Sequence, residues 1–266
     1  MKQLLKIALV SFLVFSASCS EYNKLVKSAD MEKKYEAAIK YYEKGDFIKA
    51  QALLEELIGV FRGTAKAEQV FFYYSFTCYE LEDYVTASYH FKNFAKNFPS
   101  SSHAEECAYM NAYCYYLSSP SYSLDQSDTR TAVSEMQTFM DKYPRSERIP
   151  KCNLIMDELR AKLEKKDYEN SKQYFYVTDY KSAITAFNNV LKEYPGTSHR
   201  EELNFLILKS NYMVAVNSIE KKKEERIGLG IDTYLKFVDV FPKSDYLKQA
   251  ESIYDSLLKL KTKVKT

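Results

Sequence analysis

The stretch ASYHFKNFAKNFPSS, residues 87–101, contains the pattern that decides the fold. A small residue, Ala87, is followed by bulky apolar residues four and seven positions later, and then by the pair Phe98-Pro99. Apolar residues at these spacings lie on one face of an α-helix. The proline ends that helix because it has no amide hydrogen to continue the hydrogen-bond ladder. The hydroxyl of Ser101 is then placed to accept a free amide at the start of the next helix.

The same pattern occurs five times along the chain with one internal spacing. The aromatic residues that end the five copies are Phe61, Phe98, Tyr143, Tyr194 and Phe241. The small residues that begin them are Ala50, Ala87, Ala132, Ala183 and Gly230. Only the first copy lacks the proline, because Arg62 takes its place. A small residue lets two helices approach closely, so each copy predicts the second helix of an antiparallel pair.

The spacing predicts an all-α fold made of five helix pairs and one closing helix. The pairs are expected at residues 31–61, 65–98, 102–143, 147–194 and 198–241, and the closing helix at 245–261. An unbroken long helix is expected from Ile149 to Val177, and a Ser/Pro-rich loop at 117–127. Four aspartates are predicted to cap second helices, namely Asp46, Asp83, Asp128 and Asp179. With 6 Gly and 6 Pro in 266 residues, the chain lacks the turn residues of an all-β fold.

The first residues have the features of an export signal. Residues 1–18, MKQLLKIALVSFLVFSAS, join two lysines, a short apolar run and small residues that directly precede Cys19. This arrangement resembles a bacterial lipoprotein signal, in which the cysteine receives the lipid and becomes the first mature residue. The expected consequences are lipid attachment at Cys19 and a polar tether at 19–30. The alternative is an ordinary secretory signal with a coincidental cysteine.

The repeat pattern resembles the tetratricopeptide repeat, which implies a right-handed α-solenoid. Together with the signal and Cys19, the chain is similar to the BamD family, the lipoproteins of the outer-membrane β-barrel assembly machinery. The segments FPSSSHAEE (98–106) and YPGTSHREE (194–202) carry this resemblance most specifically. It implies a non-enzymatic scaffold, anchored by lipid to the outer membrane on its periplasmic face.

The resemblance also implies partners and a division of labour along the chain. Residues 31–143 would form repeats 1–3 and a groove for unfolded outer-membrane β-barrel proteins. Residues 144–266 would form repeats 4–5 and the closing helix, which would dock the barrel insertase BamA through its POTRA domain. Other subunits of the machinery are expected partners as well.

Aromatic residues on the first helices form a candidate peptide-binding groove. Counting back from the small residue of each repeat places them at the positions that line the concave surface of tetratricopeptide domains. They are Tyr35, Tyr42, Phe72, Phe76, Tyr79, Tyr109, Tyr113 and Tyr116. Spacings of four and three put each group on one helical face. Packing of these rings in the core is the alternative, and Lys34 and Asp167 fall at positions that this register buries, so a rotated register stays open.

Composition and motifs argue against other classes of function. The formal net charge of +2 lacks the basic excess of a nucleic-acid-binding protein. No catalytic, nucleotide-binding or zinc motif is present, so no cofactor or enzymatic activity is expected. The remaining cysteines, Cys78, Cys107, Cys114 and Cys152, are expected to be small buried residues. Two rival functions remain: another periplasmic repeat lipoprotein serving cell-wall or division complexes, and sugar binding, which would favour Asp, Asn or Arg beside the rings.

Overall fold

The structure, a computed structural model, describes residues 21–264. The predicted signal peptide at 1–18 and the predicted lipid-attachment residue Cys19 lie outside the described residues. Throughout 21–264 every regular element is a helix, which confirms the all-α, tetratricopeptide-like class. In that same part of the chain, no helix combines the length and the apolar character needed to cross a bilayer.

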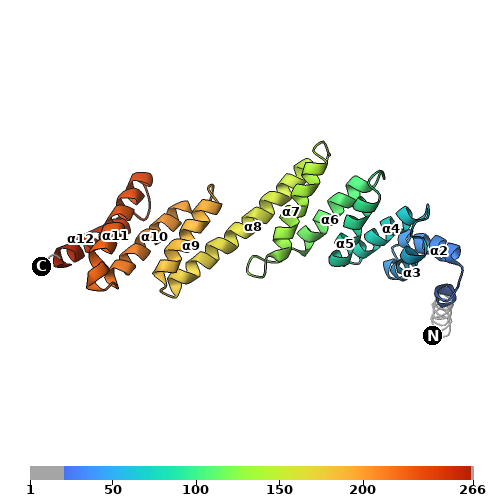
Figure 1. Cartoon of the computed structure of the whole chain (residues 1–266), viewed down its shortest axis with the longest axis horizontal. Coiled ribbons are helices and arrows are strands. Elements are labelled where there is room, and N and C mark those ends of the chain that lie inside the picture. The colour runs from blue at the N-terminus through green and yellow to red at the C-terminus, as the bar shows by residue number, and fades with distance from the viewer. Residues whose placement is uncertain (1–20, 265–266) are drawn as a thin grey trace, which may run out of the picture. The chain divides into compact units, whose positions relative to one another are not determined.

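The helices follow one another as antiparallel pairs (Figure 1). The pairs are α2 (Met31–Glu43) with α3 (Phe47–Val60), α4 (Ala67–Glu80) with α5 (Tyr84–Asn97), α6 (Ala104–Ser118) with α7 (Ser127–Lys142), α8 (Ile149–Tyr176) with α9 (Tyr180–Glu193), and α10 (Arg200–Val216) with α11 (Glu220–Val240). The last described helix is α12 (Leu247–Val264). These bounds follow the five predicted pairs and the closing helix, and the long helix begins at the expected residue, Ile149.

The described chain forms two compact units. The first contains residues 21–120 and 125–159, and the second contains residues 121–124 and 160–264. The boundary between the two units therefore falls inside α8. The reason is that the first turns of α8 place Cys152, Ile155 and Leu159 in the core of the first unit.

The repeat pattern works because its small residues are completely buried. Ala50, Ala87, Ala132 and Ala183 are all 0% exposed. The bulky residues that follow them are buried as well, among them Phe91 and Phe187. A larger side chain at the alanine positions would separate the packed helices. The alanines therefore mark the positions at which each second helix contacts its neighbours most closely.

The predicted aspartate caps are right in part. Asp83 accepts from the amide of Thr86 at 3.1 Å, and Asp179 accepts from that of Ser182 at 3.2 Å. Asp46 occupies the N-cap position of α3, but its carboxylate pairs with Lys49 at 2.5 Å instead. The prediction for Asp128 is wrong, because after the inserted loop α7 begins at Ser127 with Gln126 as its N-cap residue.

The hydroxyl residues that follow the aromatic–proline pairs do more than cap. Each accepts an amide hydrogen bond from the residue two positions later, as expected, and three of them also donate to a glutamate in the first turn of the preceding first helix. Ser101, Ser146 and Ser244 donate to Glu68, Glu105 and Glu201 at 2.6, 2.5 and 2.5 Å, respectively. These bonds join consecutive repeats through one recurring pair of side chains.

Gly230 stands where the other four copies carry alanine, and α12 explains the difference. A Cβ atom at this position would lie 3.0 Å from Cδ1 and 3.1 Å from Cδ2 of Leu257. Leu257 is completely buried and cannot move away easily. We expect Gly230→Ala to lower the free energy of unfolding by about 1 kcal/mol, because overpacking costs roughly 1–3 kcal/mol and helix propensity returns at most about 1 kcal/mol.

Urea denaturation of two backgrounds tests this prediction. With Leu257→Ala already present, adding Gly230→Ala should be stabilising, because the crowded side chain is gone. A stabilising Gly230→Ala in the natural background would show that Leu257 does not restrict this position.

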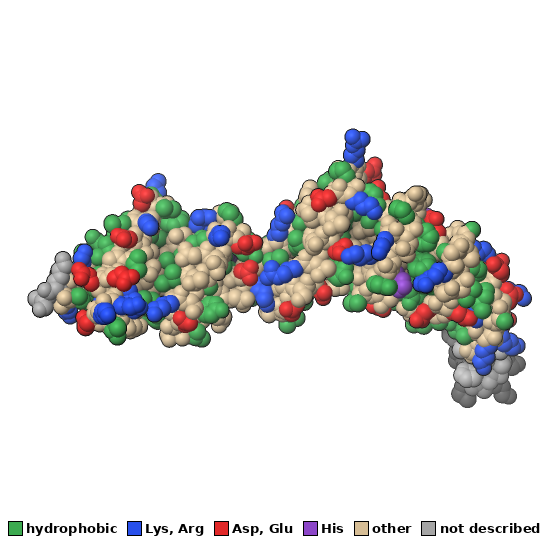
Figure 2. Space-filling model, viewed as in Figure 1, with side chains coloured by type: hydrophobic (Ala, Val, Ile, Leu, Met, Phe, Trp, Pro, Cys, Tyr) green, Lys and Arg blue, Asp and Glu red, His purple; other side chains and the backbone are tan. Residues whose placement is uncertain are grey.

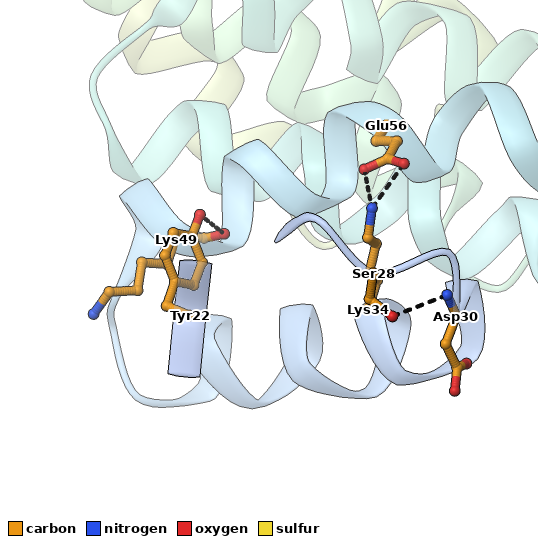
Figure 3. A network of polar contacts seen from close by, with 6 residues as sticks. All are labelled: Tyr22, Ser28, Asp30, Lys34, Lys49 and Glu56. Atoms are coloured by element: carbon orange, nitrogen blue, oxygen red, sulfur yellow. Dashed lines mark hydrogen bonds and ion pairs between the residues drawn. The ribbon is translucent and has the colours of Figure 1, made fainter. Parts of the chain in front are cut away.

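The segment predicted as a polar tether is helical at residues 21–26. The ring of Tyr22 packs edge-on against Tyr41 with 5.6 Å between centroids. Its hydroxyl donates to the backbone oxygen of Lys49 at 3.4 Å (Figure 3). The part of the tether that the structure describes is therefore packed against the first helix pair.

Candidate functional site

The aromatic residues predicted for the groove lie on α2, α4 and α6 in the first unit. Seven of the eight are half-buried, and they pack against the core while keeping part of each ring accessible. The exception is Tyr109, which is only 5% exposed. At the seven half-buried positions one side of each ring packs on the core and the other side is accessible to a ligand. We refer to the eight residues as the aromatic ladder.

On α2 and α4 the rings contact one another along and between the helices. Phe72 lies 4.7 Å from Phe76, and the imidazole of His103 lies 4.3 Å from Phe72, measured between ring centroids. Tyr42 contacts Tyr73 of the next pair at 5.0 Å. The ladder therefore extends from one first helix to the next.

On α6 the three tyrosines form a stack. Centroids of Tyr109 and Tyr113 are 5.5 Å apart with an interplanar angle of 17°, and those of Tyr113 and Tyr116 are 5.7 Å apart with an angle of 29°. The ammonium group of Lys151, on α8, lies 4.7 Å from the ring centroid of Tyr113. Such an arrangement combines a large apolar area with a cation held against the π faces.

Two tyrosine hydroxyls of the ladder, those of Tyr42 and Tyr116, stay protonated. Burial raises the pKa of Tyr42 to about 12. A hydrogen bond of 2.6 Å to Glu158, followed by burial, raises the pKa of Tyr116 to about 12. At neutral pH these groups can donate hydrogen bonds but cannot act as bases. Both hydroxyls therefore serve as hydrogen-bonding groups.

Three contributors to this surface escaped the sequence analysis. Tyr73, His103 and Lys151 contact ladder rings, yet none falls at a groove position of the repeat count. Lys151 lies 42 residues after Tyr109, on the first helix of the following repeat. A count within single repeats could not have found a contact between repeats.

A cavity of the first unit lies apart from the ladder. Its volume is about 710 Å³, and its lining includes Arg62, Phe71, Tyr89 and His90. None of the eight ladder residues lines this cavity. Arg62, the residue in place of the missing proline, lies at its edge. Burial lowers the pKa of His90, which favours a neutral imidazole there.

The cysteines and acidic residues offer no reactive or metal centre in residues 21–264. Cys78, Cys107, Cys114 and Cys152 are buried and unpaired there, as predicted for small core residues. Burial raises the pKa of the Cys114 thiol to about 12, so the thiolate needed for reaction is absent at neutral pH. Across the same span, no group of three or more His, Cys, Asp or Glu side chains could hold a metal ion.

Comparisons with solved structures find tetratricopeptide domains. The TPR domain of P58(IPK) is 13% identical, with a TM-score of 0.42 over 91% of this chain and 68% of that one. The TPR2AB domain of yeast Sti1, solved in a complex with pHSP90, is 12% identical, with a TM-score of 0.38 over 89% of this chain and 98% of that one.

Comparisons with curated proteins find assembly factors of the outer membrane. The outer membrane protein assembly factor BamD of Caulobacter vibrioides is 22% identical over 148 residues, which are 56% of this chain and 48% of that protein. The putative outer membrane protein assembly factor BamD of Aquifex aeolicus is 25% identical over 226 residues, 84% of this chain and 73% of that protein. The match thus spans about half the length of the Caulobacter relative.

A family model extends these similarities over most of the chain. Residues 27–227 match the model YfiO, described as an outer membrane lipoprotein. The matched region begins just before α2 and ends within α11, so it contains the whole aromatic ladder. Since the match covers more than half of the sequence, this chain belongs to the YfiO family of outer membrane lipoproteins.

Proposed function

We propose that the chain is an outer-membrane protein assembly factor that works as a scaffold. Cys19 carries the lipid that holds it to the outer membrane, and the helical body lies on the periplasmic side. It binds a BamA-type barrel insertase and receives unfolded β-barrel proteins. Membership of the YfiO family and the names of both relatives support this role.

The half-buried aromatic ladder is the observation that carries the client-binding part of the proposal. An unfolded barrel protein presents extended segments in which aromatic and aliphatic side chains alternate with polar ones. The accessible ring areas offer apolar contacts for these side chains, and the tyrosine hydroxyl oxygens can accept hydrogen bonds from the backbone amides of the client. Such contacts tolerate many sequences, as a receiver of different clients requires.

Insertase docking is assigned to residues 144–266. The end of α10, the turn that follows it and α11 carry exposed aliphatic side chains. They are Val216, Ile219, Leu229, Leu235 and Val240. Exposed apolar side chains of this number suit contact with a folded partner.

Replacing Tyr79 and Tyr113 together by alanine should weaken client binding at least tenfold. Each substitution removes a large aromatic contact area, and aromatic residues account for much of the energy in binding surfaces. The measurement is the affinity for a peptide from the C-terminus of a β-barrel protein, with thermal unfolding followed in parallel. Tyr79→Phe with Tyr113→Phe is the matched control, because it keeps the rings. Unchanged affinity together with a large drop in the melting temperature would assign both residues to the core.

Co-purification from crosslinked outer membranes tests the role as a whole. The expected result is recovery of a barrel insertase together with unfolded barrel proteins. Recovery of cell-wall or division proteins without an insertase would support the rival scaffold function. Oligosaccharide binding that Tyr79→Ala abolishes would instead point to a sugar-binding groove.

A further inference from the structure

A second recess of the first unit lies between the second helices α5 and α7, with α6 beneath it. Its volume is about 240 Å³. From α6 it is lined by Ala108 and Asn111, which lie on the face opposite to Tyr113 of the aromatic ladder. We call this recess the α5–α7 groove. Nothing in the proposed client binding uses it.

The groove is positively charged. Its lining contains three lysines, Lys92, Lys96 and Lys142, and a single acidic residue, Glu135, which gives 3 − 1 = +2. Figure 2 shows Lys and Arg side chains gathered on the face of the molecule over this part of the first unit. Opposite charge on a ligand would therefore be favoured here.

The one acidic residue is already neutralised by its neighbours. Lys92 donates to Oε1 of Glu135 at 2.5 Å, and the side-chain amide of Asn111 donates to Oε2 at 2.7 Å. Lys96 and Lys142 make no ion pair with any residue of 21–264. Two cations are thus available to a ligand.

Asn111 provides an independent sign of a missing partner. Its side chain is only 5% exposed, and its Oδ1 atom accepts no hydrogen bond from the described residues. A buried acceptor without a donor is unfavourable, and such atoms in native proteins are usually satisfied by something bound. Because Nδ2 of the same amide is held by Glu135, the free oxygen requires an N–H or O–H donor from outside.

We propose that the α5–α7 groove binds an acidic, extended segment of a partner protein. A carboxylate of the segment pairs with Lys96 and Lys142. A rotation of the Asn111 amide exposes Oδ1, which is buried in the unbound structure, and a backbone N–H of the segment donates to it. The aliphatic part of the acidic side chain lies on Ala95 and Phe139. At 240 Å³ the groove is smaller than the roughly 300–1,000 Å³ of sites for whole small ligands, so it suits one anchoring residue of a longer chain.

Fluorescence anisotropy with the full chain tests the charge requirement. The probe is a dye-labelled peptide with two adjacent glutamates between alanines, blocked at its C-terminus as an amide, and the control peptide has glutamine in both places. We expect the glutamate peptide to bind and the glutamine peptide to bind at least tenfold more weakly. The double variant Lys96→Gln, Lys142→Gln should bind the glutamate peptide roughly tenfold more weakly. The matched variant Lys40→Gln with Lys44→Gln removes the same charge from two exposed positions, one in the last turn of α2 and one at its C-cap. It should change the affinity for the glutamate peptide less than twofold.

A second probe tests the role of Asn111 without altering the protein. N-methylation of the glutamate amides removes the proposed donor to Oδ1 while keeping both carboxylates, and it should weaken binding several-fold. The side-chain NH₂ resonances of Asn111 should shift on addition of the unmethylated peptide only. If the Lys96/Lys142 and Lys40/Lys44 double variants lost equal affinity for the glutamate peptide, binding would depend on net charge alone. That result would overturn the proposal. Full binding of the methylated peptide would overturn it as well.

Discussion

Replacing Glu56 by alanine is expected to lower the free energy of unfolding by about 2–3 kcal/mol, although Glu56 itself is 41% exposed. The cause lies in its partner. Lys34 is 2% exposed, and its ammonium group donates to both carboxylate oxygens of Glu56, at 2.8 and 2.6 Å (Figure 3). Without Glu56 a buried positive charge would remain with no counter-ion, which is among the costliest single changes in a folded protein.

The reverse substitution should have a small effect. Lys34→Met replaces the buried lysine by an apolar side chain of similar length and leaves Glu56 in contact with water. The loss of one partner from a buried pair is costly when the remaining charge is buried, but Glu56 is 41% exposed and its carboxylate can be hydrated, so we expect a change within about 1 kcal/mol. In the Lys34→Met background, Glu56→Ala should then cost less than about 0.5 kcal/mol. Urea denaturation of the four proteins measures the coupling.

Similar losses from Glu56→Ala and Lys34→Met would contradict this account. That result would mean that the ion pair itself stabilises the fold, and that an unpaired buried ammonium group is not the main cost of losing Glu56. A Glu56→Gln variant separates the two further, because glutamine still accepts a hydrogen bond but carries no charge. Glu56→Gln should lower the free energy of unfolding, but by less than Glu56→Ala does.

This ion pair also shows why the sequence left the register of the first helices open. Lys34 and Asp167 occupy positions that the repeat count buries, and a charged residue there suggested a rotated helix. The register is in fact as counted for Lys34, because Glu56 on α3 satisfies its charge. Asp167 is half-buried and accepts from the hydroxyl of Tyr194 at 2.7 Å. Glu56 lies on the next helix and Tyr194 at the C-cap of the next helix, 22 and 27 residues away. The periodicity of a single helix carries no information about partners at such distances.

The helix pairs themselves could be predicted because their signals are local. A small residue, an apolar stripe and a proline stop lie within fifteen residues of one another, and each acts through its own helix. Gly230 and Lys151 show where such reasoning ends. The glycine is explained by Leu257, and the lysine belongs to the ladder through Tyr113. Contacts of this kind depend on how far consecutive repeats are rotated, which no spacing within one repeat specifies.

The cores of the two units are built differently. In the first unit the buried residues form one cluster that runs from Ala38 to Leu159. In the second they form three smaller clusters, centred on Phe187, on Phe205 and Phe237, and on Ile227. In repeat proteins stability is approximately a sum over neighbouring repeats, so small clusters open more independently than a continuous core. We therefore expect the second unit to lose structure locally before the first.

Replacing Phe187 by alanine should expose this difference with the largest effect of any single change considered. Phe187 is completely buried on α9, in a cluster with only five other buried residues, which include Ala183 and Leu203. Removing a buried phenylalanine costs roughly 3–5 kcal/mol, and a cluster this small has few neighbours that could close the cavity. Amide hydrogen exchange across α9 and α10 should accelerate by at least a hundredfold, since each 1.4 kcal/mol corresponds to a factor of ten.

The matched change in the first unit is Phe91→Ala, which removes an equally buried ring from α5. Because the core of the first unit is continuous, this substitution should destabilise the whole unit. Amide exchange should then accelerate throughout α2 to α7 and not only in α5. For Phe187→Ala, protection of α2 to α7 should stay within twofold of the natural protein. Acceleration of α2 to α7 by Phe187→Ala to the same extent as α9 would show a single cooperative unit, and the division of the core into separate clusters would then have no energetic meaning.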